Sequence, residues 1–147
     1  MSERIVELTM QLGAPPAEVF PYFTDPELYV RWQGIKAELD PRPGGLYRVW
    51  MDDQTVARGE YVHVDAPHKV VFTWGWENDS SVPPGSTRVE LSLTPNADGS
   101  MLLLRHLGLP NDAAAAMHTE GWKHFTTLLE VAVRPDDDKS VPSSSMT

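Results

Sequence analysis

One amphipathic segment near the C-terminus, residues 111–134, constrains the fold of this chain more than any other feature. At about 100° per residue, one face collects Ala114, Met117, His118, Gly121, Trp122, Phe125, Leu128, Leu129 and Ala132. Pro110-Asn111-Asp112 offers an N-cap, because a side-chain oxygen there can accept from free amides of the first turn. A helix of this length extends about 33–36 Å, enough to cross a whole sheet. The segment therefore predicts a long helix whose inner face carries a gap at Gly121 and a titratable group at His118.

The rest of the chain is dominated by strand patterns. Residues 4–12 predict a first strand, and two short helices, over residues 17–23 and 25–32, follow it. Six further strands are predicted at residues 35–40, 46–51, 55–64, 68–76, 88–94 and 101–107. The strand residues expected to face inward are Tyr47, Val49, Met51, Val62, Val64, Val70, Phe72, Trp74, Trp76, Val89, Leu91, Leu93, Leu102, Leu104 and His106.

This order of elements predicts the fold class. Several antiparallel strands followed by one long helix form an α+β domain, here residues 1–134, in which a single curved sheet packs on the helix. Such a sheet leaves a cavity against the helix unless large side chains fill it. Residues 135–147 are acidic and rich in serine, so we expect a disordered tail with almost nothing to bury.

Charge and composition exclude several classes of function. The net charge of −9 disfavours binding to nucleic acid or to anionic membranes. The chain contains no cysteine, which excludes disulfides and thiolate metal sites. No long apolar run or signal peptide is evident, so we expect a cytoplasmic protein without membrane insertion. Sequence motifs for nucleotide binding, zinc proteolysis and serine hydrolysis are absent, and no cofactor is predicted.

His118 and His106 are the sharpest functional candidates. We expect His118 to face the concave side of the sheet, where His106 of the last strand can approach it. Each can be a packed, hydrogen-bonded core residue, an anchor for a ligand, or an acid or base. The pair can also begin a metal site, although the spacing predicts no third ligand.

Arg58 and Glu60 share one face of their strand, because they are two residues apart. On the concave side they would pair with each other or bind a ligand, and Glu60 could carry a proton. On the convex side they would be a solvated pair of little consequence. Gly59 between them permits a bulge that would re-aim both side chains.

Aromatic residues offer the material of a small-molecule pocket: Tyr47, Phe72, Trp74, Trp76, Trp122 and Phe125. Plain core packing is the alternative for each of them. The residues that we predict to line a ligand cavity are Phe72, Trp74, Leu104, His106, Met117, His118, Gly121 and Trp122. On the outside, Trp50, Met101 and Leu103 offer an apolar surface for a homodimer.

Several short motifs, in this order, resemble those of one known superfamily: Pro16-Ala17-Glu18-Val19-Phe20, Asp25-Pro26, Trp32, Pro43-Gly44-Gly45, Phe72-Thr73-Trp74, Arg105-His106, Gly108-Leu109-Pro110 and Gly121-Trp122. Across residues 4–134 the chain is similar to the START-like (SRPBCC) superfamily, in the branch homologous to the activator of the heat-shock protein 90 ATPase. The resemblance implies a helix-grip fold, with seven antiparallel strands curled around the C-terminal helix and a deep cavity between them.

The resemblance also implies a range of functions. Relatives bind lipids, polyketides, aromatic metabolites or hormones in the cavity, and a minority catalyse cyclisation or hydration there. We expect no counterpart of the extra N-terminal domain that the chaperone activator carries, and the sequence shows no match to the iron-ligand set of the oxygenases. We therefore expect binding of a small hydrophobic or aromatic molecule. The alternatives are a cavity enzyme that uses His118 or Glu60, and a stress-related or chaperone-linked interaction module.

Overall fold

The predicted long helix is present as α4, Asp112–Ala132, in the computed structural model, which describes residues 4–134. It begins at Asn111, whose side chain accepts a hydrogen bond from the amide of Ala114 at 2.8 Å. No helix within this described part of the chain is long and apolar enough to cross a membrane. The predicted disordered tail, residues 135–147, lies outside the described residues.

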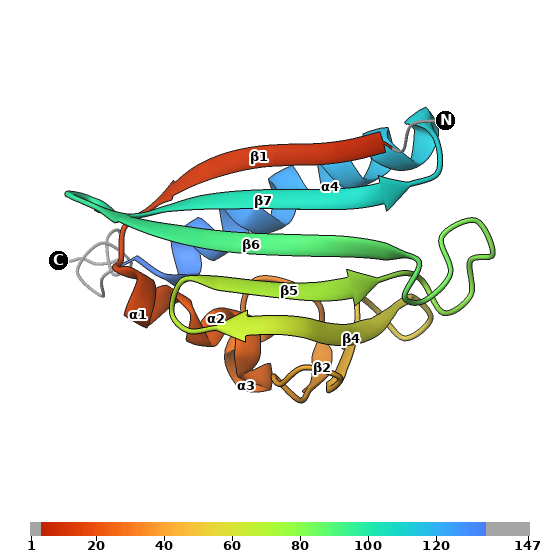
Figure 1. The fold of residues 1–147 in the computed structure, drawn as a ribbon, viewed down its shortest axis with the longest axis horizontal. Coiled ribbons are helices and arrows are strands. Elements are labelled where there is room, and N and C mark those ends of the chain that lie inside the picture. The colour runs from red at the N-terminus through yellow and green to blue at the C-terminus, as the bar shows by residue number, and fades with distance from the viewer. Residues whose placement is uncertain (1–3, 135–147) are drawn as a thin grey trace, which may run out of the picture.

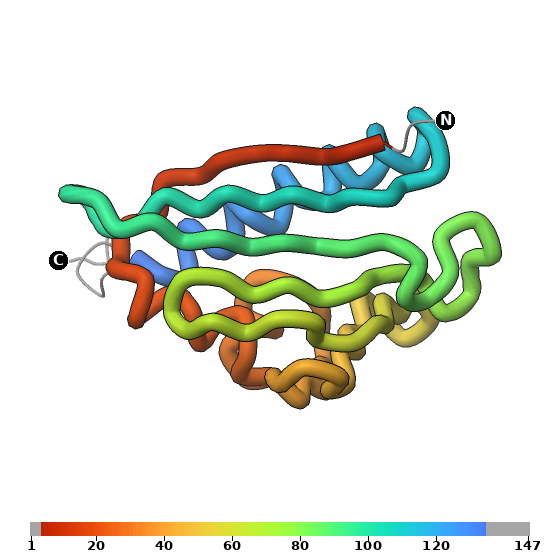
Figure 2. The backbone as a smooth tube through the Cα atoms, in the orientation of Figure 1, coloured from red at the N-terminus to blue at the C-terminus, as the bar shows by residue number. Residues whose placement is uncertain are grey.

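Seven strands form one antiparallel sheet that curls over α4 (Figure 1). The strands are β1 (Arg4–Leu12), β2 (Lys36–Leu39), β3 (Leu46–Trp50), β4 (Val56–Asp65), β5 (Lys69–Trp74), β6 (Thr87–Asn96) and β7 (Gly99–Leu109). Their order in the sheet is β1-β7-β6-β5-β4-β3-β2, so each strand from β2 to β7 pairs with its chain neighbours and β1 closes on β7. The backbone trace shows α4 running behind β1, β7 and β6 (Figure 2). This confirms the helix-grip fold.

Three short helices, rather than the predicted two, connect β1 to β2. They are α1 (Pro16–Val19), α2 (Pro21–Thr24) and α3 (Pro26–Tyr29), and a proline begins each one. Proline suits the first helical position, because its fixed φ is helical and its missing amide hydrogen would be unsatisfied there anyway. The segment brings four buried aromatic side chains into the core: Phe20, Phe23, Tyr29 and Trp32.

Strand β4 departs from the predicted pattern. Tyr61 is fully buried and Val62 is 39% exposed, so the prediction of an inward Val62 was wrong. A register shift between Tyr61 and His63 inserts one extra residue, which returns Val64 to the core side. The backbone of Gly59 packs closely against β5, because a Cβ at this position would lie 2.0 Å from the carbonyl oxygen of Thr73.

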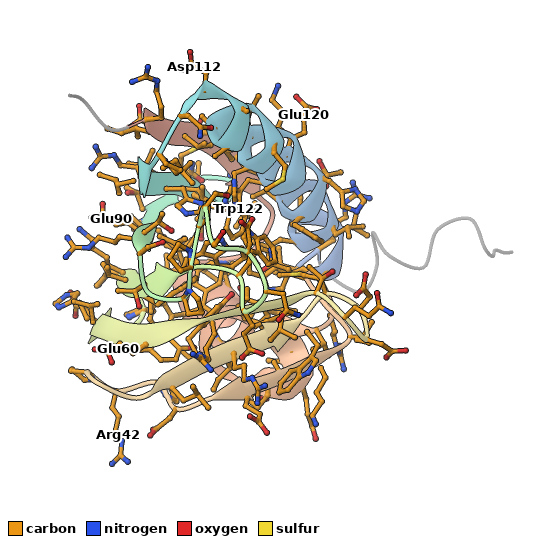
Figure 3. All side chains as sticks on the ribbon, turned by 90° about the vertical axis from the view of Figure 1, so that its right-hand side faces the viewer. Arg42, Glu60, Glu90, Asp112, Glu120 and Trp122 are labelled. Atoms are coloured by element: carbon orange, nitrogen blue, oxygen red, sulfur yellow. The ribbon has the colours of Figure 1, made fainter. Side chains whose placement is uncertain are left out.

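Because Tyr61 faces the core, the alternation of β4 places Glu60 and Arg58 on the opposite, convex side of the sheet. Both are exposed, and Glu60 lies on the outside of the molecule, away from α4 (Figure 3). Arg58 pairs with Glu77 at 3.4 Å, and Arg48 of β3 shares that carboxylate at 2.8 Å. The convex, solvated alternative of the sequence interpretation is therefore the one that the structure adopts.

The buried stripe of α4 is narrower than predicted. His118, Trp122, Thr126 and Leu129 are its buried residues, whereas Leu128 is 40% and Met117 53% exposed. Thr126 can be buried because its hydroxyl donates to the carbonyl of Trp122 at 2.7 Å. The prediction of an inward Leu128 was wrong. The polarity of residues in the sequence does not show that a threonine whose hydroxyl is hydrogen-bonded within its own helix can take a core position instead of a leucine.

Candidate functional site

A cavity of about 490 Å³ lies between the first half of α4 and one end of the sheet. The residues lining it are Gln33, Met51, Gln54, Thr55, Val56, Trp74, Trp76, Asn78, Asp79, Met117, His118, Gly121, Trp122 and Phe125. They come from α4, the segment after α3, the β3–β4 turn, and the end of β5 with the loop that follows. Small-molecule sites have volumes of roughly 300–1,000 Å³ and combine aromatic walls with a few polar groups. This cavity has both properties.

Gly121 makes room for the cavity in the middle of α4. A Cβ built on it would meet no atom within 4 Å, so no neighbour requires glycine there. Glycine inside a helix costs about 1 kcal/mol relative to alanine. Neither close packing nor a left-handed backbone explains its presence, and the space that it leaves open belongs to the cavity.

Trp122, one turn C-terminal to His118, points from α4 into the interior, whereas Glu120 points outward (Figure 3). Its indole N–H donates to Nδ1 of His106 at 3.0 Å, and Nε2 of His106 bonds to the hydroxyl of Thr87 at 2.8 Å. Thr87 in turn donates to the carbonyl of Trp74 at 2.7 Å. Because indole can only donate, Nδ1 of His106 is the unprotonated nitrogen and Nε2 carries the hydrogen.

His118 is held in the opposite tautomer. Its Nδ1 lies 2.8 Å from the carbonyl of Ala114, which can only accept, and Trp76 donates its indole N–H to Nε2 at 3.1 Å. Nδ1 of His118 therefore carries the hydrogen, and both of its ring nitrogens are occupied. A proton on Nε2 would remove the hydrogen bond from Trp76.

Both histidines are neutral at pH 7. Burial lowers the pKa of His106 to about 3, and the nearby His118 contributes to the same direction. Burial also lowers the pKa of His118, although the Ala114 carbonyl and Asp79 oppose the shift. The two rings lie edge to face with centroids 4.9 Å apart, so a charge on one would disfavour a charge on the other.

The structure brings five of the eight predicted site residues together at the cavity: Trp74, Met117, His118, Gly121 and Trp122. The other three are fully buried and do not line it. Phe72 stacks on Tyr47 with ring centroids 4.0 Å apart, Leu104 belongs to the hydrophobic core, and His106 lies behind Trp122. The alternation of a strand predicts which side a residue faces, but not which part of that side stays open.

Sequence reasoning missed the polar part of the wall, which comes from turns and loops. Gln33 is the deepest of these residues, with 2% of its surface exposed. Its Oε1 accepts from the hydroxyl of Tyr29 at 2.6 Å, and that hydroxyl also bonds to Tyr47. Only its position directly after Trp32 could have indicated burial, because no periodic pattern covers this segment.

Among the described residues, none of those that line the cavity is a lysine or an arginine. Its one carboxylate is Asp79, and hydrogen bonds from Ser81 lower the pKa of that group, so it is ionised at neutral pH. Within residues 4–134, no group of three or more His, Asp or Glu side chains is arranged to hold a metal ion.

Comparisons with known proteins identify relatives for nearly the whole described chain. A sequence model of the family described as "Activator of Hsp90 ATPase homolog 1-like protein" matches residues 13–134. An AHSA1-like protein from Rhizobium etli is 37% identical, with a TM-score of 0.73, covering 99% of this chain and 91% of that one. A protein from Mesorhizobium loti has a TM-score of 0.80 at 24% identity, covering 88% and 96%.

CalU16 from Micromonospora echinospora shares the fold, with a TM-score of 0.73 at 23% identity, covering 93% of this chain and 80% of that one. Among functionally curated proteins, none matches this chain.

Proposed function

The chain belongs to the family of Activator of Hsp90 ATPase homolog 1-like proteins, and from this premise we propose that it binds a small, largely apolar molecule in the cavity beside α4. The observation that carries the proposal is the gap at Gly121. A mid-helix glycine with open space around it weakens the helix without improving packing. A glycine at position 121 is explained if a ligand occupies the space beside it.

The composition of the wall supports an aromatic ligand. Three tryptophans, together with Phe125, Met51 and Met117, contribute ring faces and flexible thioethers. Aromatic rings gain from stacked and edge-to-face contacts beyond their buried area, and methionine adapts to irregular shapes. Met117 lines the cavity and is exposed, so we expect its flexible side chain to cover a bound molecule.

The two groups that the sequence offered as proton carriers do not support the enzyme alternative. Glu60 is exposed on the convex side of the sheet, away from the cavity. His118 lines the cavity, but both of its nitrogens already form hydrogen bonds within the protein. A chaperone-linked interaction stays a prediction.

Thermal unfolding in the presence of neutral bicyclic and tricyclic aromatic compounds tests the proposal. A ligand that binds only the native state stabilises it by about 2.7 kcal/mol at 100 times its Kd, so the Tm should rise with concentration. Gly121→Leu places a side chain in the cavity and should abolish the shift. Ala116→Leu adds the same side chain at an exposed position of α4 and should retain it. Equal shifts in both variants would contradict binding at this site.

A further inference from the structure

The deep wall of the cavity contains a hydrogen-bond donor that residues 4–134 leave without an acceptor. Gln33 lines the cavity and is 2% exposed, and its Oε1 accepts from Tyr29 at 2.6 Å. Among the described residues, no acceptor bonds to its amide nitrogen, Nε2. Nε2 is not fully buried, and Gln33 lines the cavity, so a molecule in the cavity can reach this nitrogen. A ligand that covered Nε2 without accepting from it would remove its hydration and give nothing in return.

The tyrosine pair determines which end of the Gln33 amide remains available. Tyr29 bonds to both Gln33 and Tyr47, and each hydroxyl has only one hydrogen to donate. If Gln33 presents Oε1 to Tyr29, then Tyr47 donates to Tyr29 and Tyr29 donates to Gln33, so both hydroxyls are satisfied. With the amide reversed, Tyr29 would donate to Tyr47, and the hydrogen of Tyr47 would lack an acceptor in this cluster. The arrangement with Nε2 free is therefore the favoured one.

A second donor in the same wall is also unmatched. The indole nitrogen of Trp74 is buried and has no acceptor among residues 4–134. Three other tryptophans do have one: Trp32 donates to the Tyr22 carbonyl at 2.9 Å, Trp76 to His118 at 3.1 Å and Trp122 to His106 at 3.0 Å. The unmatched groups of the deep wall are thus donors rather than acceptors.

The charges of the side chains that line the cavity also restrict the charge of the ligand. No lysine or arginine within residues 4–134 lines the cavity, and the ionised Asp79 would repel an anion. An anionic ligand would lose hydration without gaining a partner of opposite charge. A ligand with a strong donor would find its acceptors at the half-buried Asp79 and at Gln54, Thr55 and Asn78, which are exposed to water, and not beside Gln33 in the deep wall.

Resting on the proposed function, we infer that the ligand is a neutral aromatic compound with a carbonyl-type acceptor, and that Gln33 selects it by donating from Nε2 to that oxygen. The Tyr29–Tyr47 pair positions the amide for this contact. The Trp74 N–H has no exposed surface, so the contact with the ligand rests on Gln33.

Three probes of one shape test the inference: 2-acetylnaphthalene, its near-isosteric hydrocarbon 2-ethylnaphthalene, and the anion 2-naphthoate. For the wild-type protein we expect the ketone to bind about 10-fold more tightly than the hydrocarbon, since one hydrogen bond is worth about that factor. 2-Naphthoate should bind more weakly than the ketone. Side-chain amide NMR of Gln33 should shift with the ketone and not with the hydrocarbon, a readout that needs no variant.

Gln33→Met removes the amide at similar length. The ratio of the two dissociation constants should fall to about one, while hydrocarbon binding changes little. Gln11→Met, the same substitution at an exposed position of β1 away from the cavity, should keep the ratio.

Equal binding of ketone and hydrocarbon to the wild type would overturn the inference and leave the proposed function standing. Tightest binding of 2-naphthoate would overturn the neutral ligand class. Binding of none of the probes, at any concentration that they reach in solution, would count against both the inference and the proposed function.

Discussion

Trp76 donates its indole N–H to Nε2 of His118 across 3.1 Å, and this bond joins the segment after β5 to the first half of α4. The imidazole can accept it only while it is neutral. The contact between these two parts of the cavity wall is therefore coupled to the protonation state of His118.

Removing the donor should change that protonation state. In Trp76→Phe, Nε2 of His118 becomes free to take a proton, so the pKa of His118 should rise toward the ordinary value for histidine. Titration of the imidazole resonances by NMR measures the change. Trp50→Phe, which alters a tryptophan stacked against Lys36 and Arg48 on the surface, is the control and should leave His118 unchanged.

Acid should destabilise the fold through His106. Its folded pKa, about 3, lies below its unfolded value of about 6.5, so the unfolded chain binds the proton first. The stability from the neutral ring is full above pH 6.5 and declines as the pH falls toward 3. Between pH 7 and pH 5 the loss from this group is about 2 kcal/mol.

Urea unfolding of wild type and His106→Gln at both pH values measures this loss. Glutamine can keep a donor and an acceptor but cannot titrate, so the variant should lose less stability on acidification. His63→Gln replaces an exposed histidine of β4 and serves as the matched control. An equal loss in all three proteins would contradict the assignment.

Two glycine substitutions should have opposite effects on stability. Gly121→Ala should raise the free energy of unfolding by about 0.5–1 kcal/mol, because the added methyl group meets open space and alanine favours the helix. Gly59→Ala should destabilise the protein, since its Cβ would lie 2.0 Å from the carbonyl oxygen of Thr73. Chemical denaturation of both variants decides the point, and a loss of stability in Gly121→Ala would show that the site is tightly packed.

The buried tyrosine pair should respond unequally to loss of its hydroxyls. Tyr29→Phe leaves two partners unmatched, Gln33 and Tyr47, and should cost about 2–4 kcal/mol. Tyr47→Phe removes only the bond that Tyr29 accepts and should cost about 1 kcal/mol. Equal losses in urea denaturation would contradict the direction of the hydrogen-bond chain.

Periodicity predicted the elements that are regular and half-buried. The alternation in β5 and β6 correctly placed Val70, Phe72, Val89 and Leu91 inward, because one face of each strand meets the core. In β4 the bulge after Tyr61 changed the phase, and a backbone irregularity of this kind leaves no clear trace in residue types. On α4, Thr126 looked polar in sequence and is buried because its own helix satisfies it.

The cavity was harder to predict than the sheet. Gly121 and His118 were recognised on the correct helix face, and both lie at the cavity. Gln33 and Asp79 were missed because they reach it from irregular segments, whose positions depend on how distant elements pack. Whether the predicted residues bind a ligand stays a prediction.

The open space at Gly121 makes this protein suitable for bump-and-hole engineering. Because no neighbour would clash with a Cβ there, alanine, valine and leucine at this position would form a graded series of plugs in one scaffold. Under the proposed function, an analogue trimmed to fit one plug would be excluded by the variants with larger plugs and accepted by those with smaller ones. One helix position would thereby set the largest ligand that the cavity admits.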